Sequence, residues 1–277
     1  MRHRSVQLLA ILIALNLLFA GYGEADEITA ADVIAKCRIR TNATDSRGHL
    51  DMSLKKISGE DLQNRRVFYF WKDYAGSGDL WSKSIVFVQY PPAEEDSGYL
   101  RFEYTLESGR EPEQWLYTPN LQTVVRLAKR DSTQKSVGIV GDDLSVLLWN
   151  EGSQRLLSSK QGALGTSYVI EIVPKSTQLP YVKINSEYLV QDDDWDKCTR
   201  QRTEFFNKDG AVFKLITEDW AQQQQYWYRQ RVQVKNLVTG TIADYKFHDF
   251  EFDVGFSDNY FTTRELPHAF RMINLRK

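Results

Sequence analysis

The sequence predicts a mainly β protein, of the α+β class, whose centre is a wide, aromatic antiparallel sheet. The first observation is an alternation that places Leu100, Phe102 and Tyr104 on one side of an extended segment. A period of two residues is typical of a strand with one buried face. The second observation is a turn at 108–113, which contains a glycine and a proline and leads into the apolar segment Gln114–Tyr117. Two extended segments joined by a short polar turn predict a hairpin.

The first 25 residues have the pattern of a secretory signal peptide. Two arginines precede the apolar run Val6–Ala20, and small residues follow it up to Ala25, as at a cleavage site. The run is shorter than the roughly 20 residues of a membrane span, and a retained N-terminal anchor is the alternative. Tyr22 stands where a lipid-modified N-terminus would need a cysteine. We therefore expect cleavage near Ala25, a soluble periplasmic protein that is not a lipoprotein, and a single domain over residues 26–277.

Charge and cysteine content restrict the partners and the compartment. The formal net charge of −2 provides no long-range attraction for nucleic acid or for an anionic membrane, so we expect no nucleic-acid binding. Cys37 and Cys198 are the only two cysteines in the sequence. In an oxidising exported compartment they could join the N-terminal helix to a later hairpin. Two free buried thiols are an equally good interpretation, because cysteine behaves as a small apolar residue.

Short elements are expected before the central hairpin. Thr29 is the expected N-cap of a helix of about three turns, because an acid follows in the first turn and Val33 begins an apolar face. Strands are expected around Leu50–Leu54, at Arg66–Trp71 and at Ser82–Tyr90. The aromatic residues of Arg66–Trp71 fall on both sides of the strand, so we expect that strand to be covered on both faces.

The segments after the hairpin predict a long connection, a helix and a second set of strands. Residues 128–140 are polar and predict the connection. Residues 144–149 are apolar and follow two acids, which favours a helix start; we expect this helix and the N-terminal helix to act as a lid. Turn signals then separate seven expected strands. These are Leu156–Ser159, Ser167–Val173, Tyr181–Val190, Arg200–Phe206, Val212–Asp219, Tyr226–Val234 and Thr241–Phe247.

Motifs that would carry catalysis or hold a metal are absent from the sequence. It has no H-E-x-x-H or C-x-x-C spacing, no G-x-S-x-G, no P-loop and no G-x-G-x-x-G. A pair of catalytic carboxylates would come from distant strands, and nothing in the sequence selects two of its acids. We therefore expect no catalytic residues, no cofactor and no metal, and interpret the chain as non-enzymatic.

Two polar clusters in the sequence have spacings that could indicate a site. The aspartates at 192, 194 and 196 have the spacing of a calcium loop, but Lys197 and Thr203 stand where that loop needs glycine and glutamate. An acidic hairpin tip is the better interpretation. His248 beside Asp249 is interpreted as a strand-end histidine satisfied by its neighbour rather than as half of a base dyad.

A set of short motifs runs from the third expected strand to the tail of the chain. The motifs are Tyr90-Pro91-Pro92, Asp96-Ser97-Gly98-Tyr99-Leu100, Trp115-Leu116-Tyr117-Thr118-Pro119 with Arg126, Gly141-Asp142-Asp143-Leu144, and Tyr260-Phe261-Thr262 with Leu266. They resemble the outer-membrane lipoprotein-sorting (LolA-like) superfamily, especially its exported branch found beside RND- or MMPL-type inner-membrane exporters. The resemblance covers most of the mature chain. It implies a large antiparallel half-barrel whose concave face is covered by a few helices, and a cavity that carries acylated proteins.

The sequence departs from that branch at the polar rim of the expected cavity. Gln122, Thr123 and Val125 stand where the branch tends to have arginines, and only Arg126 is retained. Residues 144–148 are also more apolar than in the branch. The rim is therefore weaker, whereas the expected apolar lining is retained.

These observations lead to one main hypothesis and two alternatives. We expect a monomeric periplasmic carrier that holds a lipid or the acyl chains of a lipoprotein for transfer between the inner and outer membranes, with an RND- or MMPL-type exporter as a further partner. The residues expected to line its cavity are Leu100, Phe102, Tyr104, Trp115, Tyr117, Leu144, Leu147 and Trp149, with Arg126 at the rim. The first alternative is a sensor or accessory module with a filled core that binds a partner protein such as the exporter. The second is an enzyme with a cleft of convergent titratable groups.

Overall fold

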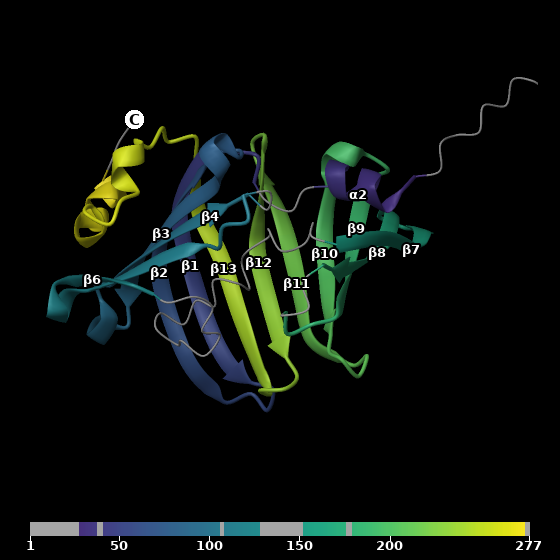
Figure 1. Cartoon of the computed structure of the whole chain (residues 1–277), viewed down its shortest axis with the longest axis horizontal. Coiled ribbons are helices and arrows are strands. Elements are labelled where there is room, and N and C mark those ends of the chain that lie inside the picture. The colour runs from purple at the N-terminus through teal and green to yellow at the C-terminus, as the bar shows by residue number, and fades with distance from the viewer. Residues whose placement is uncertain (1–27, 38–40, 106–107, 128–151, 176–178, 275–277) are drawn as a thin grey trace, which may run out of the picture.

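One antiparallel sheet of thirteen strands dominates the computed structural model, which describes residues 28–37, 41–105, 108–127, 152–175 and 179–274 (Figure 1). The strands of the first half are β1 (Asp45–Lys56), β2 (Asp61–Asp73), β3 (Leu80–Tyr90), β4 (Gly98–Tyr104), β5 (Glu113–Thr118) and β6 (Thr123–Arg126). Those of the second half are β7 (Gly152–Gly162), β8 (Gly165–Pro174), β9 (Lys183–Gln191), β10 (Cys198–Phe206), β11 (Val212–Gln223), β12 (Tyr226–Asn236) and β13 (Thr241–Phe252). Among the described residues, helix α2 (Ala30–Lys36) precedes them all.

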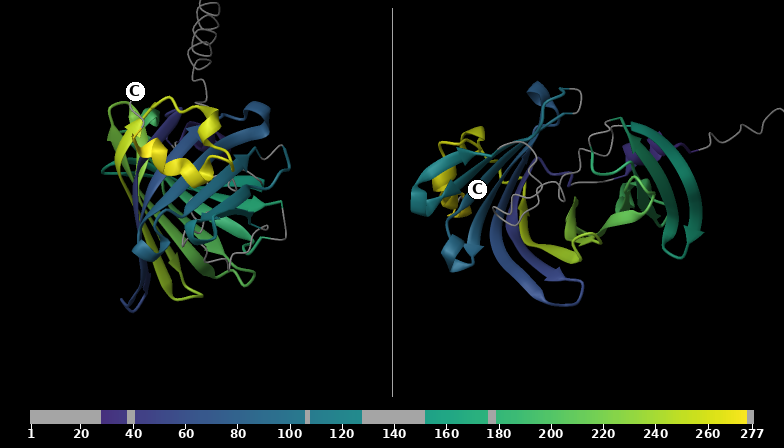
Figure 2. Two further views of the ribbon diagram at one scale, coloured as in Figure 1. Left: turned by 90° about the vertical axis from the view of Figure 1, so that its left-hand side faces the viewer. Right: turned by 60° about the horizontal axis from the view of Figure 1, so that its bottom comes forward.

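The strand order divides the sheet into two halves that meet at one seam. The order is β6-β5-β4-β3-β2-β1-β13-β12-β11-β10-β9-β8-β7. All neighbours except β1 and β13 follow each other in the chain, so consecutive antiparallel pairs build each half and the β1–β13 pairing joins them. Strands β6 and β7 are the two edges, and the sheet curves without closing (Figure 2). We call the concave side, where α2 lies, the inner face and the convex side the outer face.

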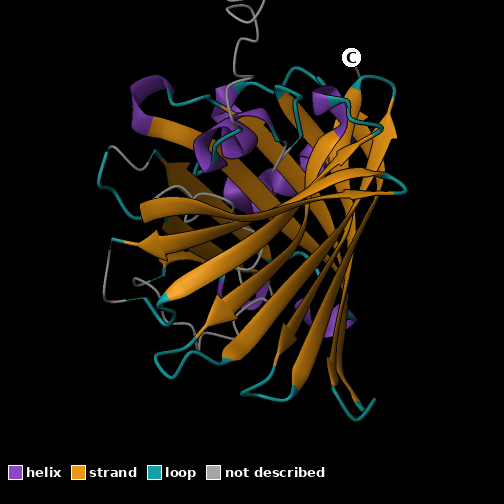
Figure 3. Cartoon of the chain, turned by 90° about the vertical axis from the view of Figure 1, so that its right-hand side faces the viewer, coloured by secondary structure: helices purple, strands orange, loops and turns teal. Residues whose placement is uncertain are grey.

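The strands predicted from the sequence are confirmed, with ends that differ by a few residues. One difference is at the end of β13, which continues to Phe252 instead of ending at Phe247. A register shift between Arg47 and His49 of β1 allows the pairing with β13 to continue past His248, because a bulge absorbs one residue without ending the ladder. Strands make up most of the described chain, and the helical segments are short (Figure 3).

Strand β2 is covered on both faces, as its sequence predicts. Val67 is fully buried in the inner hydrophobic cluster, while Phe70 is fully buried in a second cluster on the outer face. Successive side chains of a strand point to opposite faces, so the continuous apolar run of β2 serves two cores. The sheet therefore separates two packed layers over its first half.

Helix α2 packs against the inner face and is fixed there by a disulfide. Thr29 is its N-cap and forms a capping box with Asp32, which satisfies backbone N–H groups of the first turn. Val33 is fully buried in the inner cluster. Cys37, which follows the helix, is joined to Cys198 of β10 across a sequence separation of 161. The paired interpretation of the two cysteines is thus confirmed, and the helix is shorter than predicted, with seven residues.

The C-terminal segment covers the outer face of the first half. It contains the 3-10 segments η6 (Asp258–Tyr260) and η7 (Leu266–Asn274), and it lies outside the curve of the sheet in Figures 1 and 2. Phe261 and Leu266 are fully buried, and Ala269 and Met272 nearly so. They share a cluster with strand residues such as Leu100. Gly98 permits this contact, because a Cβ there would lie 3.0 Å from the Leu266 side chain.

A buried carboxylate anchors this segment where it leaves β13. Asp45 is 2% exposed. Its carboxylate accepts hydrogen bonds from the backbone N–H groups of Val254, Gly255 and Phe256 at 2.6–3.2 Å. Arg47 donates to the carbonyl of Met272 at 3.2 Å and so binds the far end of the segment. The segment is thus held at both ends as well as by its apolar contacts.

The half-barrel expectation is confirmed, with one addition that the sequence did not reveal. A helix covers the inner face, as expected, but the C-terminal segment covers the outer face. The expected signal peptide at 1–25 and the expected helix at 144–149 lie outside the described residues. Within the described residues, none of the helices has the length and apolar character needed to cross a membrane.

Candidate ligand-binding face

Aromatic side chains cover the inner face around the β1–β13 seam. Tyr69 of β2 lies 6.0 Å from Phe247 and 6.5 Å from Phe250, both on β13, between ring centroids. Tyr228 of β12 lies 5.3 Å from Phe250, and Phe250 stacks on Phe252 at 5.5 Å. These separations are typical of interacting aromatic pairs. Three strands thus contribute to one continuous aromatic surface.

The backbone of β1 is shaped to admit one of these rings. Gly48 has no Cβ, and a Cβ there would lie 3.1 Å from the Phe250 ring and 3.0 Å from the carbonyl oxygen of His248. The opposing strand bulges at this point, where Asp249 has a φ of +55°. The glycine and the bulge together bring Phe250 close to the sheet, so the aromatic surface is continuous over the seam.

Some of the aromatic side chains on the inner face are only partly buried. Tyr69, Tyr226 and Tyr228 are half-buried and pack against the inner cluster, whereas Phe247, Phe250 and Phe252 are buried. An apolar floor with half-exposed tyrosines above it suits a guest that has both apolar and polar parts, because a tyrosine offers a ring and a hydroxyl.

A buried ion cluster borders the aromatic surface. Arg200 of β10 binds Glu218 of β11 with two hydrogen bonds of 2.8 Å, and both side chains are 1% exposed. Arg229 of β12 lies 3.4 Å from the same carboxylate. Burial opposes ionisation of Glu218, but the two arginines outweigh it and keep the pKa of that carboxyl below its ordinary value. Glu218 is therefore charged at neutral pH.

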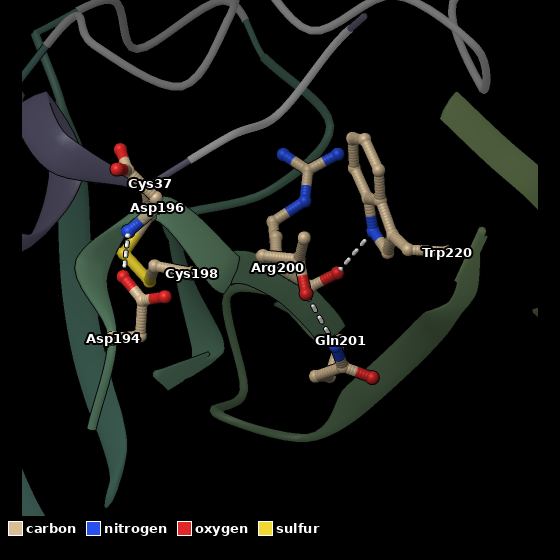
Figure 4. Close-up of a disulfide and its surroundings, with 8 residues drawn as sticks. Cys37, Asp194, Asp196, Cys198, Arg200, Gln201 and Trp220 are labelled. Atoms are coloured by element: carbon tan, nitrogen blue, oxygen red, sulfur yellow. Dashed lines mark hydrogen bonds between the residues drawn. A yellow bond between two sulfur atoms is a disulfide. The ribbon is translucent and has the colours of Figure 1, made fainter. Parts of the chain in front are cut away.

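The disulfide lies beside this cluster. Cys198 precedes Arg200 on β10, and the indole N–H of Trp220 donates to the Arg200 carbonyl at 2.7 Å. Figure 4 shows the Trp220 ring next to the Arg200 side chain. The bond to Cys37 thus fixes α2 next to the charged end of the inner face.

A second pair of charged residues lies on the inner face at β4. Arg101 and Glu103 point to the inner face and bind each other at 3.0 Å, with side-chain exposures of 6% and 13%. Burial raises the pKa of Tyr69, and the charges of Arg229, Glu103 and Arg101 also act on its hydroxyl. Charges from β4 and β12 therefore converge on a tyrosine of β2. The inner face combines an apolar floor with a polar array that reaches across it.

Four of the expected cavity-lining residues lie on the other face of the sheet. Leu100 is fully buried in the outer cluster, and Phe102, Trp115 and Tyr117 pack against that cluster. The expectation that they form the concave wall is corrected: they lie on the convex side, under or beside the C-terminal segment. The alternation of a strand fixes which residues share a face, but it does not show which face becomes concave. Whether they contact any ligand stays a prediction.

The other expected site residues are placed as follows. Tyr104 is buried, donates to Glu113 at 2.9 Å, and belongs to neither of the two clusters. Arg126 is exposed and binds Glu113 at 2.8 Å on the outer face. The remaining three, Leu144, Leu147 and Trp149, lie outside the described residues.

Outside the inner face, His248 and the 192–196 tip pair with neighbouring side chains. The ring nitrogens of His248 contact Asp249 at 2.7 Å and Asp51 at 3.2 Å. In the 192–196 tip, Lys197 pairs with Asp192 at 2.8 Å. Among the described residues, no group of three or more His, Cys, Asp or Glu is placed to hold a metal ion. A surface pocket of about 450 Å³ near Arg66 and Asp244 is lined mostly by charged and polar residues, with Met52 and Tyr90 as its apolar members.

Sequence reasoning missed the ion cluster, although one signal for it was available. Ile216, Glu218 and Trp220 alternate along β11, so a charged residue occupies a position that the pattern assigns to the apolar face. A charge at an inward position needs a partner, and Arg200 on the preceding strand supplies it.

Comparisons with known proteins address this fold directly. A family model described as an uncharacterized-protein-like family matches residues 81–268, which is more than half of the chain. The chain belongs to this family. Its fold is the LolA-like fold. No curated protein matches the chain.

Solved structures with this fold match most of this chain and nearly all of their own chains. A domain named for outer membrane lipoprotein sorting, from Vibrio parahaemolyticus, has a TM-score of 0.69 at 21% identity over 86% of this chain and 96% of its own. A DUF1329 family protein from Desulfovibrio piger has a TM-score of 0.69 at 20% identity, covering 86% and 95%. A LolA superfamily protein from Nitrosomonas europaea has 0.59 at 16%, covering 85% and 98%. These likenesses establish the fold, and the resemblance seen in the sequence motifs is confirmed.

Proposed function

We propose that this LolA-like protein is a non-enzymatic periplasmic carrier that holds a lipid, or the acyl chains of a lipoprotein, against the inner face of its half-barrel. The observation that carries the proposal is the continuous aromatic surface of Tyr69, Tyr228 and Phe250 on the concave side of the sheet. The printed name of the Vibrio relative, outer membrane lipoprotein sorting, supports the same class of cargo.

The physical basis is transfer of an apolar chain from water to an apolar surface. Each buried methylene of a guest contributes roughly 0.8 kcal/mol, so a chain of moderate length binds without any covalent step. The half-buried tyrosines provide area for such contacts, and the charges of Arg229 and Arg101 act on the Tyr69 hydroxyl on the same face. Transfer between the two membranes, with an RND- or MMPL-type exporter as partner, belongs to this proposal and is supported by the signal-like residues 1–25.

Two measurements on the protein purified without detergent test the proposal. Mass spectrometry of organic extracts is expected to find a lipid at a stoichiometric level. After delipidation, a fluorescent fatty acid is expected to bind with increased emission. Absence of extracted lipid together with absence of fatty-acid uptake would refute the carrier proposal and would favour a module with a filled core.

A matched pair of variants locates the binding. Tyr228→Ala removes a half-buried aromatic ring on the inner face, whereas Phe102→Ala removes a half-buried ring on the outer face, 4.9 Å from Trp115. The first variant is expected to weaken fatty-acid uptake several-fold, and the second to leave it unchanged. Thermal unfolding of both variants checks that each is folded.

A further inference from the structure

The outer face carries an aromatic surface beyond the part that the C-terminal segment seals. Phe102, Trp115 and Tyr117 of β4 and β5 are half-buried there. Strand pairing sets Trp115 beside Arg126 of β6 and Phe102 beside Lys83 of β3. We call these five residues the outer aromatic surface. They include four of the predicted site residues, Phe102, Trp115, Tyr117 and Arg126, which the carrier function on the inner face leaves without a role.

Cationic side chains lie against the rings of this surface. The Lys83 ammonium is 4.8 Å from the centre of the Phe102 ring, and the Arg126 guanidinium is 5.9 Å from that of Trp115. The Arg110 guanidinium lies 3.6 Å from the Tyr104 ring at the adjoining end. Aromatic faces attract cations at such distances, and this contact keeps the charged ends at the surface of the sheet.

The local charge is positive although the chain as a whole is not. Lys83, Arg110 and Arg126 contribute three cations, and Glu113 is the acid that binds the two arginines, at 3.7 and 2.8 Å. Lys72 and Asp258 add one charge of each sign beside Lys83, and the exposed Glu111 adds one acid next to Arg110. Cations therefore outnumber acids by one in this region, whereas the formal net charge of the chain is −2. An attraction for anions therefore arises from the placement of the charges on this face and not from their overall balance.

Exposed apolar side chains flank the same region. Leu121, in the 3-10 turn η3 (Pro119–Leu121) between β5 and β6, is 68% exposed. Phe270 of η7 is 44% exposed and lies 6.2 Å from Phe87 on the neighbouring strand. Single exposed apolar residues are ordinary. The Arg271 guanidinium lies 5.9 Å from the Phe270 ring, and Leu121 lies in the turn between the strands that carry Tyr117 and Arg126. Apolar, aromatic and basic side chains together are the composition of protein surfaces at a membrane–water interface.

We propose that the outer aromatic surface docks on an anionic lipid bilayer. Arg126 and Lys83 meet the phosphate groups, the Trp115 and Tyr117 rings lie at headgroup level, and Leu121 enters the acyl boundary. This inference goes beyond the carrier function and rests on it in one respect, since a carrier of acyl cargo has to meet a membrane. An acidic protein partner would need the cations without the insertion of Leu121.

Co-sedimentation with vesicles tests the proposal on the full mature protein. The vesicles are phosphatidylcholine alone, or phosphatidylcholine mixed with phosphatidylglycerol. Binding is expected to the mixed vesicles at low salt, with little binding to phosphatidylcholine alone. Arg126→Gln is expected to weaken the partition about fivefold, the loss of one basic contact with an anionic surface, and Leu121→Ser is expected to weaken it by a similar factor.

The matched control is Arg202→Gln on β10. Arg202 is also exposed and paired, 2.6 Å from Glu204, but it lies in the other half of the sheet, and its loss is expected to leave the partition unchanged. Equal partition to both kinds of vesicle, or equal effects of Arg126→Gln and Arg202→Gln, would overturn the proposal. An effect of Arg126→Gln without one of Leu121→Ser would overturn the insertion of Leu121 and would leave an electrostatic contact with the headgroups.

The two proposals fail in different ways. A protein that takes up fluorescent fatty acid but ignores anionic vesicles retains the carrier function and loses the docking surface. A protein that binds anionic vesicles through Arg126 but takes up no fatty acid retains the docking surface and loses the carrier function.

Discussion

The two faces of the sheet bury apolar residues in different ways. On the outer face, the chain's own C-terminal segment inserts Phe261 and Leu266 into the sheet, and both are fully buried. On the inner face, the described cover is α2 at one end, and Tyr69 and Tyr228 remain half-buried around the seam. Both faces bury charges: the inner face holds the Arg200–Glu218 pair at 1% exposure, whereas Asp45 and Arg47 bind the backbone of the C-terminal segment on the outer face.

The difference assigns stability to one part of the outer face. The part that the C-terminal segment seals serves stability, because Leu100, Phe261 and Leu266 are fully buried there. A face with half-exposed rings and fixed charges has remaining surface for a guest. Outer-face substitutions should therefore alter unfolding without altering uptake, and inner-face substitutions should affect uptake.

The largest effect is expected from breaking the bond that fixes the cover of the inner face. The Cys37–Cys198 disulfide closes a loop with a sequence separation of 161, and the loop-entropy estimate for such a loop is about 5 kcal/mol. Cys37→Ala with Cys198→Ala is expected to lower the free energy of unfolding by up to about that amount, measured by urea denaturation. A loss below about 1 kcal/mol would contradict an anchoring role for the bond.

The next largest effect is expected from removing one member of the buried ion pair. Glu218→Ala leaves Arg200 buried without its carboxylate and is expected to cost about 3–5 kcal/mol. The double variant Arg200→Met, Glu218→Leu is expected to recover most of this loss, because both charges are removed together. Denaturant midpoints of the two variants check the prediction, and an equal loss in both would show that packing rather than charge dominates.

A truncation on the outer face tests whether the outer cluster contributes to stability alone. Leu100 is fully buried under the C-terminal segment, and Leu100→Ala is expected to cost about 3 kcal/mol. Fatty-acid uptake of the folded variant should equal that of the wild type. Reduced uptake at full folding would mean that the outer cluster takes part in binding after all.

The smallest effect is expected in the pH dependence of stability, through the carboxylate that follows β13. Asp253 accepts hydrogen bonds from Thr44 and from the Tyr226 hydroxyl. Burial opposes its ionisation, but these bonds outweigh it and lower its pKa below the ordinary value of 3.8. A depressed folded-state pKa contributes stability that is present above the unfolded value and is lost as pH falls through the folded one.

The wild type should therefore lose stability in acid partly through Asp253, and Asp253→Asn should show a smaller loss over the same range. Thermal unfolding from about pH 6 to about pH 2 measures the two slopes. Parallel slopes would exclude a contribution from this carboxylate.

The sequence predicts the strands well because their signal is local. The alternation of Leu100 and Phe102 determines which residues share a face, and the apolar run of β2 indicates cover on both sides. The curvature of the sheet is not a local property, since it depends on the β1–β13 seam, which pairs residues about 200 positions apart. The sequence therefore predicts that Leu100 and Phe102 share a face, but not that this face is the convex one.

Two other features depend on contacts that a single sequence does not specify. In the C-terminal segment, Leu266, Ala269 and Met272 recur every three residues, which is the period of a 3-10 helix. This spacing does not show that the segment docks on the outer face, where these residues join Phe261 in one cluster. The partnership of Arg200 with Glu218 follows from the register of β10 and β11. The disulfide, by contrast, required only that the two cysteines meet, and both interpretations stayed open until the structure placed them together.

The most direct test of the two-face account is photo-crosslinking with a diazirine-labelled fatty acid, followed by peptide mass spectrometry. The account predicts label on inner-face residues of β2, β12 and β13, such as Tyr69, Tyr228 and Phe250, and none on Phe102 or Trp115. Label concentrated on Phe102 and Trp115, with the inner aromatic residues unlabelled, would contradict it.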